Sequence, residues 1–328
     1  MSFLINLLKF PFILWKIKSQ MKTQNAFIKS FVQPILDRFE ESNDGSLLEQ
    51  DFNKIKNYYG LGSVVLVGEA IAGLHGHALS VQERKALTYI SAITGLYDDF
   101  FDKSIPNLQR IKLLSEVSQT VDDLNTHEAL FRELLKTALQ NIADVETSKV
   151  FAAEVYKNQV ESLKQKNTGL SWEELLEISL QKGGASLLLY RSTLSTEISE
   201  EEKQALFLIG GQLQVCNDVF DVVKDLKEGI QTLGTEAKTI QQLRELVERI
   251  DVQNRLVIEK LDLPNTSYFN SRIKFVTSQT YVALDFYEKA TLTTQEGFKV
   301  REYDPKEVTL AMDRPVNFLK AVGKYCMK

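Results

Sequence analysis

Apolar residues recur along most of this chain at the three-to-four-residue spacing that is typical of amphipathic helices. In residues 26–41, Phe27, Phe31 and Ile35 follow one another every fourth position, and residues 61–78 are almost continuously apolar. No convincing run of alternating apolar and polar residues indicates a strand. The pattern predicts an all-α chain of roughly ten to twelve helices, with short loops that favour antiparallel neighbours.

Two helix starts are marked by capping boxes, in which a serine precedes a glutamate by three residues. Ser171 and Glu174 form the first box, and Ser199 and Glu202 form the second, which opens the helix that runs toward Gln214. Other helices are expected at residues 47–59, 84–103, 106–122, 126–141, 145–165, 235–261 and 266–290.

Two helix interruptions are also predicted. Pro34 lacks a backbone donor and is expected to kink or restart the helix at residues 26–41. Gly183 and Gly184 lie inside an otherwise good helix pattern, where each glycine costs roughly 1 kcal/mol relative to alanine. That cost favours a local break next to Lys182.

The first 18 residues are strongly apolar, with Lys9, Lys16 and Lys18 interspersed and Pro11 among them. The stretch is too short and too interrupted to span a bilayer, and it lacks the features of a signal peptide. It is expected either to lie at a membrane interface as an anchor or to pack on the folded body. The predicted organisation is an amphipathic arm at residues 1–24 and one helical domain at residues 25–328.

The composition allows a large core and excludes some partners. The 328 residues are 44% hydrophobic, and the net charge of −5 includes no concentrated basic stretch beyond the N-terminus. That balance gives no electrostatic footprint for nucleic acid. Cys216 and Cys326 form no metal-binding or disulfide pattern, which fits a reducing cytoplasm. The oligomeric state is open, with a homodimer among the options.

Two acidic stretches carry the candidate chemistry. In a helix over residues 84–103, Asp98 and Asp102 share one face about 6 Å apart and suit the bridging of a hard dication. In the second stretch Asn217, Asp221 and Asp225 fall at i, i+4 and i+8, so their oxygens are expected to line one face of a helix.

Both stretches are embedded in apolar residues, although a charge run at a helix end is more often a solvated face. Buried like charges are unfavourable unless a cation neutralises them. Mg²⁺ is usually held by one or two carboxylates together with substrate phosphate oxygens, so a diphosphate would complete two facing half-sites. The sequence therefore predicts a magnesium site.

The first stretch, Asp98-Asp99-Phe100-Phe101-Asp102, resembles the DDxxD motif of class I isoprenoid synthases. The second is similar both to the (N,D)Dxx(S,T)xxxE triad of terpene cyclases and to the FQxxDDxxD motif of trans-prenyl diphosphate synthases, the latter through residues 214–221. The resemblance covers most of residues 60–290. It implies a helical bundle around a central apolar cavity that opens where the acidic residues lie.

The same resemblance implies roles for individual residues. Asp98, Asp99, Asp102, Asn217, Asp221 and Asp225 would form the catalytic set, and all except Asp99 would hold three Mg²⁺ ions, for which Mn²⁺ can substitute. A linear prenyl diphosphate would contact Lys182, Gln214, Lys227 and Arg191, with Tyr97, Phe101 and Phe220 beside the prenyl chain. The structural alternative makes Lys182 a surface residue next to a packing glycine pair and the aromatic residues ordinary core.

The resemblance implies that the diphosphate leaves to give an allylic carbocation, which either cyclises or is elongated with isopentenyl diphosphate. Elongating enzymes bind a second diphosphate with cationic residues around the first motif. No lysine or arginine occurs in residues 57–80, and only Lys103 and Arg110 follow Asp102 closely. We therefore favour a terpene cyclase, although Lys182 and Gln214 look more synthase-like. A non-catalytic isoprenoid carrier is the alternative from another class.

Overall fold

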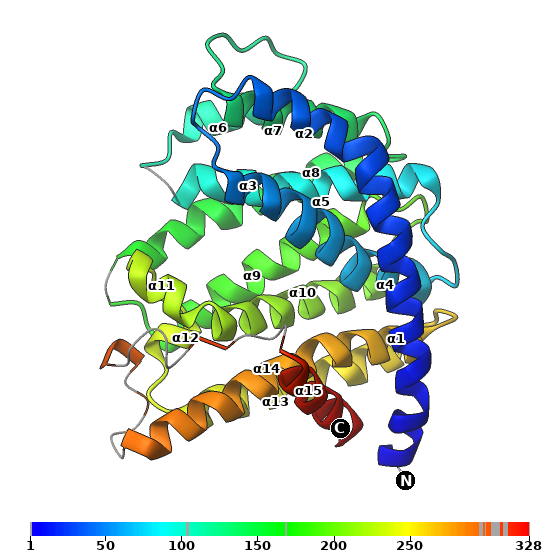
Figure 1. Cartoon of the computed structure of the whole chain (residues 1–328), viewed down its shortest axis with the longest axis vertical. Coiled ribbons are helices and arrows are strands. Elements are labelled where there is room, and N and C mark those ends of the chain that lie inside the picture. Colours follow the sequence, from blue (N-terminus) through cyan, green and yellow to red (C-terminus); the bar gives the residue numbers. More distant parts are fainter. Residues whose placement is uncertain are drawn as a thin grey trace. The chain divides into compact units, whose positions relative to one another are not determined.

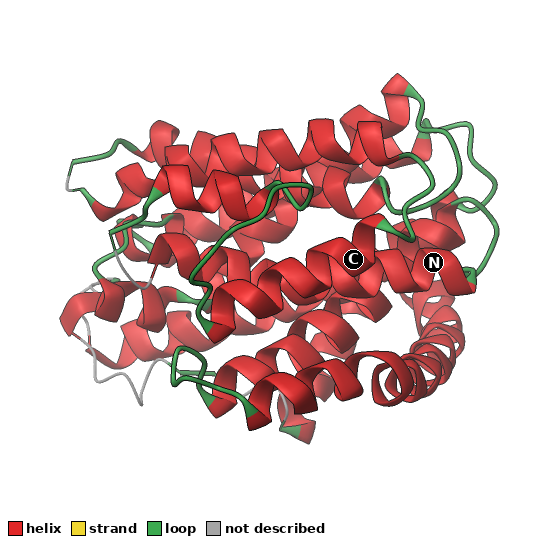
Figure 2. Ribbon diagram, turned by 90° about the horizontal axis from the view of Figure 1, so that it is seen from above, coloured by secondary structure: helices red, strands yellow, loops and turns green. Residues whose placement is uncertain are grey.

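The computed structural model of the chain describes residues 2–102, 105–167, 169–294, 298, 300–302, 309–310 and 314–327, and these residues form helices and loops without a strand (Figures 1 and 2). The prediction of an all-α fold is confirmed. The helices in chain order are α1 (Ser2–Phe27), η1 (Ile28–Val32), α2 (Gln33–Glu41), α3 (Glu49–Asn53), η2 (Lys54–Gly68), α4 (Glu69–Leu74), α5 (Val81–Asp102), α6 (Leu108–Ser115), α7 (Thr126–Leu139), α8 (Val145–Ser162), η3 (Leu163–Lys166), α9 (Trp172–Arg191), α10 (Glu200–Phe220), α11 (Val222–Glu228), α12 (Leu233–Glu236), α13 (Ile240–Glu259), α14 (Thr266–Thr294), η4 (Val300–Glu302) and α15 (Pro315–Met327).

The chain divides into two compact units. Unit 1 comprises residues 1–13, 152–188 and 198–328, and unit 2 comprises residues 14–151 and 189–197. Helices α1, α8 and α9 each contribute residues to both units. The predicted boundary at residue 24 falls inside α1, which continues to Phe27.

Unit 2 is built around α5, which packs against η2 and α7. The buried face of α5 includes Ala86, Ile90 and Ile93, and it meets Leu130 and Leu134 of α7 in one apolar cluster. The segment η2 is a 15-residue π-helix. It packs against α5, the helix that carries the first acidic motif.

Unit 1 contains the second acidic motif. Helix α10 packs against α13 and α14, and α14 packs against α15. Val215 and Val219 of α10 lie in an apolar cluster with Leu243 and Val247 of α13. This packing holds the C-terminal end of α10 in place.

The N-terminal arm packs on the folded body. Phe10 is buried, and its ring lies 5.8 Å from Phe275 of α14 and 5.3 Å from Tyr325 of α15, measured between centroids. Of the two arrangements expected for the arm, packing is therefore observed. Among the described residues, no single helix is long and apolar enough to cross a membrane, and only the bent pair α10–α11 meets the length and composition criteria.

One predicted helix interruption is confirmed and the other is wrong. The π-helical segment η1 ends at Val32, and α2 restarts with Pro34 in its first turn, where a missing backbone donor is tolerated. Helix α9 instead runs without a break from Trp172 to Arg191, through both glycines. The glycines serve helix packing, as the site geometry shows.

Candidate functional site

The first acidic motif occupies the last turn of α5. Asp98 and Asp99 are half-buried, and Asp102, the final residue of the helix, is exposed. Helical geometry through Asp102 keeps Asp98 and Asp102 one turn apart, as expected. Lys103, the next cation along the chain, lies outside the described residues.

Tyr59 of η2 lies beside this motif. Its ring covers Gly95, where an added Cβ would come within 2.5 Å of the Tyr59 ring. Burial, reinforced by the negative charge of Asp98, raises the pKa of the Tyr59 hydroxyl well above its usual value. Tyr59 is therefore a neutral hydrogen-bond donor close to Asp98. It could not be predicted from the sequence, because Tyr59 lies some 40 residues before Asp98.

The aromatic residues of the first motif pack toward α7. Tyr97 lies 5.4 Å from Phe101 and stacks on Phe131 at 5.8 Å, and Phe101 is only 1% exposed. Phe100 stacks on His127 at 4.4 Å. These contacts give Tyr97 and Phe101 a place in the core of unit 2, and contact with a prenyl chain stays a prediction.

The second acidic motif lies at a bend instead of on one straight helix. Helix α10 ends at Phe220, α11 begins at Val222, and their axes differ by 74° at Asp221. The expectation of a single stripe over two helical turns is thus wrong. Helical hydrogen bonds nevertheless continue through the bend, with the Asp221 amide donating to the Asn217 carbonyl and the Asp225 amide to the Asp221 carbonyl, both at 2.8 Å.

The bend keeps the predicted ligands near one another. Asn217 Nδ2 donates to Asp221 Oδ2 at 3.1 Å, and both residues are half-buried. Asp225 is buried, and burial together with the charges of Asp221 and Asp218 raises its pKa to about 7. The bend therefore keeps Asn217 in contact with Asp221 and leaves Asp225 close enough to Asp221 to feel its charge.

Asp218 is a site residue that the sequence prediction missed. It is 3% exposed and accepts hydrogen bonds from Ser179 Oγ at 2.6 Å and Gln214 Nε2 at 3.0 Å. Burial raises its pKa to about 6, while these hydrogen bonds and the charge of Lys182 oppose that rise. The i, i+4 spacing of Gln214 and Asp218 is the signal in the sequence that indicates this pair.

Glycines bring α9 close enough to α10 for these contacts. A Cβ on Gly183 would overlap the Gly210 carbonyl, and a Cβ on Gly210 would overlap the Gly183 carbonyl. Gly211 likewise lies against Leu180, with an added Cβ only 2.7 Å from its side chain. The two backbones therefore touch at this crossing, which places Ser179 beside Asp218.

A cavity of about 330 Å³ opens at the α10–α11 bend. Phe220, Asp221 and Lys227 line it, together with Lys224 and Tyr287. Lys227 is exposed, so its ammonium group can reach an anionic ligand in this cavity. Two predicted substrate residues, Phe220 and Lys227, are thus found beside a predicted metal ligand.

Arg191 has a structural role in unit 2. Its side chain is 1% exposed, and its two terminal nitrogens donate to the carbonyls of Thr196 at 3.0 Å and Glu197 at 2.8 Å. These bonds hold the loop after α9. The predicted contact of Arg191 with a diphosphate stays a prediction.

The donors at the bend suit a hard cation. Within the described ranges, no group of three or more His, Cys, Asp and Glu side chains forms a metal-binding cluster by itself. The bend supplies carboxylate oxygens from Asp221 and Asp225 and an amide from Asn217, which is oxygen chemistry of the kind Mg²⁺ prefers. The pKa values of Asp218 and Asp225 are raised, which indicates that the neighbouring lysines do not fully offset the effect of burial on these carboxyl groups.

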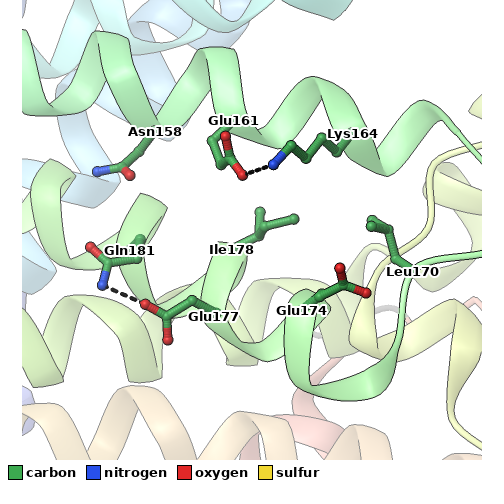
Figure 3. Close-up of a pocket in the computed structure, with 8 residues that line it drawn as sticks. All are labelled: Asn158, Glu161, Lys164, Leu170, Glu174, Glu177, Ile178 and Gln181. Atoms are coloured by element: carbon green, nitrogen blue, oxygen red, sulfur yellow. Dashed lines mark hydrogen bonds and ion pairs between the residues drawn. The ribbon is translucent and has the colours of Figure 1, made fainter.

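A second pocket in unit 1 is lined by three glutamates, each of which has a partner within the fold (Figure 3). Between α8 and α9, Glu161 pairs with Lys164, and Gln181 Nε2 donates to Glu177 at 2.7 Å. Glu174 completes the predicted capping box by accepting from Ser171 at 2.8 Å. These glutamates have structural partners, and the pocket holds none of the predicted site residues.

The chain matches no protein-family model, no curated protein and no solved structure.

Proposed function

We propose that this protein is a Mg²⁺-dependent class I terpene synthase that ionises a linear prenyl diphosphate and releases diphosphate. The observation that carries the proposal is the acidic cluster at the α10–α11 bend, where Asp218 and Asp225 are buried and Asp221 adds a third carboxylate. Burying two acids next to a third, half-buried one is strongly unfavourable unless a cation balances them. A binding pocket for a neutral isoprenoid has no need of such a cluster.

The proposed metal ligands form two half-sites, with Asn217, Asp221 and Asp225 in unit 1 and Asp98 and Asp102 in unit 2. Bound Mg²⁺ would stabilise the negative charge that develops on the leaving diphosphate. Asp99 belongs to the same motif as Asp98 and adds negative charge next to it. The proposal further includes an apolar cavity that binds the prenyl chain.

Other residues of the chain have roles around each half-site. Ser179 and Gln214 hold Asp218 by hydrogen bonds and thereby fix its carboxylate orientation. Lys182, whose charge acts on Asp218, and Lys227, in the cavity at the bend, would bind diphosphate oxygens as charge-assisted donors. Tyr59 retains its proton beside Asp98 and can donate to a substrate oxygen.

The surroundings of the first motif favour cyclisation over elongation. Arg110, the nearest described cation that follows this motif in sequence, pairs with Glu128 at 2.8 Å and donates to the carbonyls of Asp122 and Asp123. Those bonds hold the guanidinium group of Arg110 against residues of the fold. A second diphosphate would therefore lack charge-assisted hydrogen bonds from this arginine.

Purified protein incubated with Mg²⁺ and geranyl, farnesyl, geranylgeranyl or longer diphosphates, with and without isopentenyl diphosphate, tests the proposal. We expect diphosphate release and a hydrocarbon or terpene alcohol without the co-substrate. Asp98→Asn, Asp221→Asn and Asn217→Ala should each lower turnover by about 10²-fold or more, because each removes a predicted metal ligand. Glu177→Gln is the matched control, since Glu177 lines the other pocket, and it should keep full turnover.

Three outcomes would overturn parts of the proposal. Undiminished turnover in EDTA would refute the metal mechanism. A longer linear diphosphate formed only with isopentenyl diphosphate would identify an elongating synthase. Tight binding of prenyl diphosphates without any diphosphate release would identify a carrier.

A further inference from the structure

His127 of α7 contacts the end of α5 that carries the first acidic motif. Its side chain is 8% exposed, and Nε2 lies 2.8 Å from the Leu96 carbonyl oxygen. Because a carbonyl oxygen can only accept, Nε2 carries the proton and donates to it. The imidazole also stacks on the Phe100 ring, with centroids 4.4 Å apart and 17° between the planes. One side chain thus contacts α5 both before and after Asp98 in the sequence.

The backbone of His127 is held in place by the loop that follows α2. The His127 amide donates to Ser46 Oγ at 3.0 Å, and the neighbouring Thr126 amide donates to Asp44 Oδ2 at 3.1 Å. In return the Asp44 amide donates to Thr126 Oγ1 at 3.0 Å. All of these residues belong to unit 2, as does α5. The first turn of α7 therefore presents the imidazole to α5 from a fixed position.

The charges at the end of α5 make its last turn unfavourable as an isolated helix. Asp98, Asp99 and Asp102 lie at the C-terminal end, where the helix dipole is negative and the final carbonyls have no partner within the helix. No basic residue occurs in the last turn to compensate. Repulsion among the carboxylates adds to this effect and favours fraying when no cation is bound. Contacts from outside the helix therefore help to keep Asp98 and Asp102 on one face.

We infer that His127 is a positioning residue for the half-site formed by Asp98 and Asp102. It holds the last turn of α5 in helical geometry through Leu96 and Phe100, and thereby sets the spacing of the two carboxylates before Mg²⁺ binds. This inference rests on the proposed function. Loss of a residue that orients a metal ligand commonly weakens metal binding by about 10- to 100-fold. A histidine that only fills the core would affect stability and leave the Mg²⁺ requirement unchanged.

Two substitutions separate the donor of His127 from its ring. His127→Gln keeps an N–H donor at about the reach of Nε2, whereas His127→Phe keeps a ring that can stack on Phe100 but has no donor. We expect His127→Phe to need about tenfold more Mg²⁺ for half-maximal diphosphate release, and His127→Gln less than about threefold more. Tyr89→Phe is the matched control, because the Tyr89 hydroxyl donates to the Phe31 carbonyl at 3.1 Å from an earlier turn of α5. It should keep the wild-type Mg²⁺ requirement.

Two further measurements do not depend on turnover. Electron paramagnetic resonance of Mn²⁺ with inorganic diphosphate and each protein should give the same order of metal affinities. Hydrogen exchange of the metal-free protein in EDTA should be faster in residues 97–102 of His127→Phe than in the wild type, and unchanged there in Tyr89→Phe. Circular dichroism and thermal melts verify that each variant folds. His127→Asn replaces His127→Phe if the latter does not fold, because its shorter amide does not reach the Leu96 carbonyl.

The outcomes distinguish this inference from the proposed function. A wild-type Mg²⁺ requirement and wild-type hydrogen exchange in the donor-free variant would overturn the inference and leave the proposed function intact. Lower turnover at saturating Mg²⁺ with an unchanged Mg²⁺ requirement would also overturn it, because His127 would then be a structural residue only. A wild-type protein that releases no diphosphate, or whose turnover is undiminished in EDTA, would instead refute the proposed function and this inference with it.

Discussion

At the scale of single residues, the ionisation of Asp225 couples the site to stability. The pKa of this buried carboxyl is raised from its ordinary 3.8 to about 7 in the metal-free fold, so folding favours its neutral form. This carboxyl therefore has no effect on stability below about pH 4, lowers the free energy of unfolding increasingly between about pH 4 and 7, and has a constant destabilising effect above that range. We expect Asp225→Asn to stabilise the metal-free protein at pH 8, on the order of 2 kcal/mol, and to have little effect at pH 4.

Urea unfolding in EDTA at both pH values measures this difference. Glu83→Gln supplies a control of opposite sign. Burial opposes ionisation of Glu83, but hydrogen bonds from Ser195 and Ser80 lower its pKa to about 2. The stability that ionised Glu83 contributes is fully present above about pH 4.5 and is lost as pH falls through about 2. Glu83→Gln should therefore be less stable than the wild type at pH 8. If Asp225→Asn is also destabilised at pH 8, Asp225 is not held in its neutral form.

The sequence could identify the acidic residues but could not determine which were buried. Asn217, Asp221 and Asp225 were predicted from spacing, and the structure brings them together. Asp218 was missed because its environment depends on Ser179, which lies 39 residues earlier on another helix. Tyr59 was missed for the same reason, since only folding brings η2 to α5.

At the scale of helices, the glycine pair was recognised but misinterpreted. Helix propensity alone makes Gly183 and Gly184 unfavourable, and that cost suggested a break. In the fold the cost is offset by a close crossing of α9 and α10, which no larger residue permits at Gly183 or Gly210. The bend at Asp221 was equally hidden, because no proline or glycine occurs in residues 212–228 to mark it.

The crossing of α9 and α10 leads to a prediction. Gly183→Ala should destabilise the protein by several kcal/mol, on the order of 2–4, because the new methyl group overlaps the Gly210 backbone. It should also displace Ser179 from Asp218. Gly323→Ala is the matched control, since no atom lies within 4 Å of the added Cβ in α15, and it should be stabilising by about 0.5–1 kcal/mol. Urea unfolding of both variants is the measurement, and equal effects would contradict the close crossing.

At the scale of the whole molecule, the all-α class followed from local periodicity, whereas the organisation into units did not. Apolar spacing along each helix is a local property, and it correctly excluded strands over the described residues. The contact of α1 with α14 and α15 joins residues more than 250 positions apart. No local pattern distinguishes a helix that packs from one that lies on a membrane, because both need an apolar face.

The contribution of α1 to the fold is testable with a matched pair of substitutions. Phe10 packs on Phe275, Phe318 and Tyr325, so Phe10→Ala should lower the free energy of unfolding by about 3 kcal/mol through lost burial and the cavity left behind. Phe12, two positions on, is 54% exposed, and Phe12→Ala should change the free energy of unfolding by less than about 0.5 kcal/mol.

Thermal melts and urea unfolding of both proteins measure this difference. A protein that lacks residues 1–13 should melt earlier than the wild type, because the α14 and α15 surface that Phe10 covers becomes exposed. A truncated protein that melts like the wild type would mean that the arm contributes nothing to the fold.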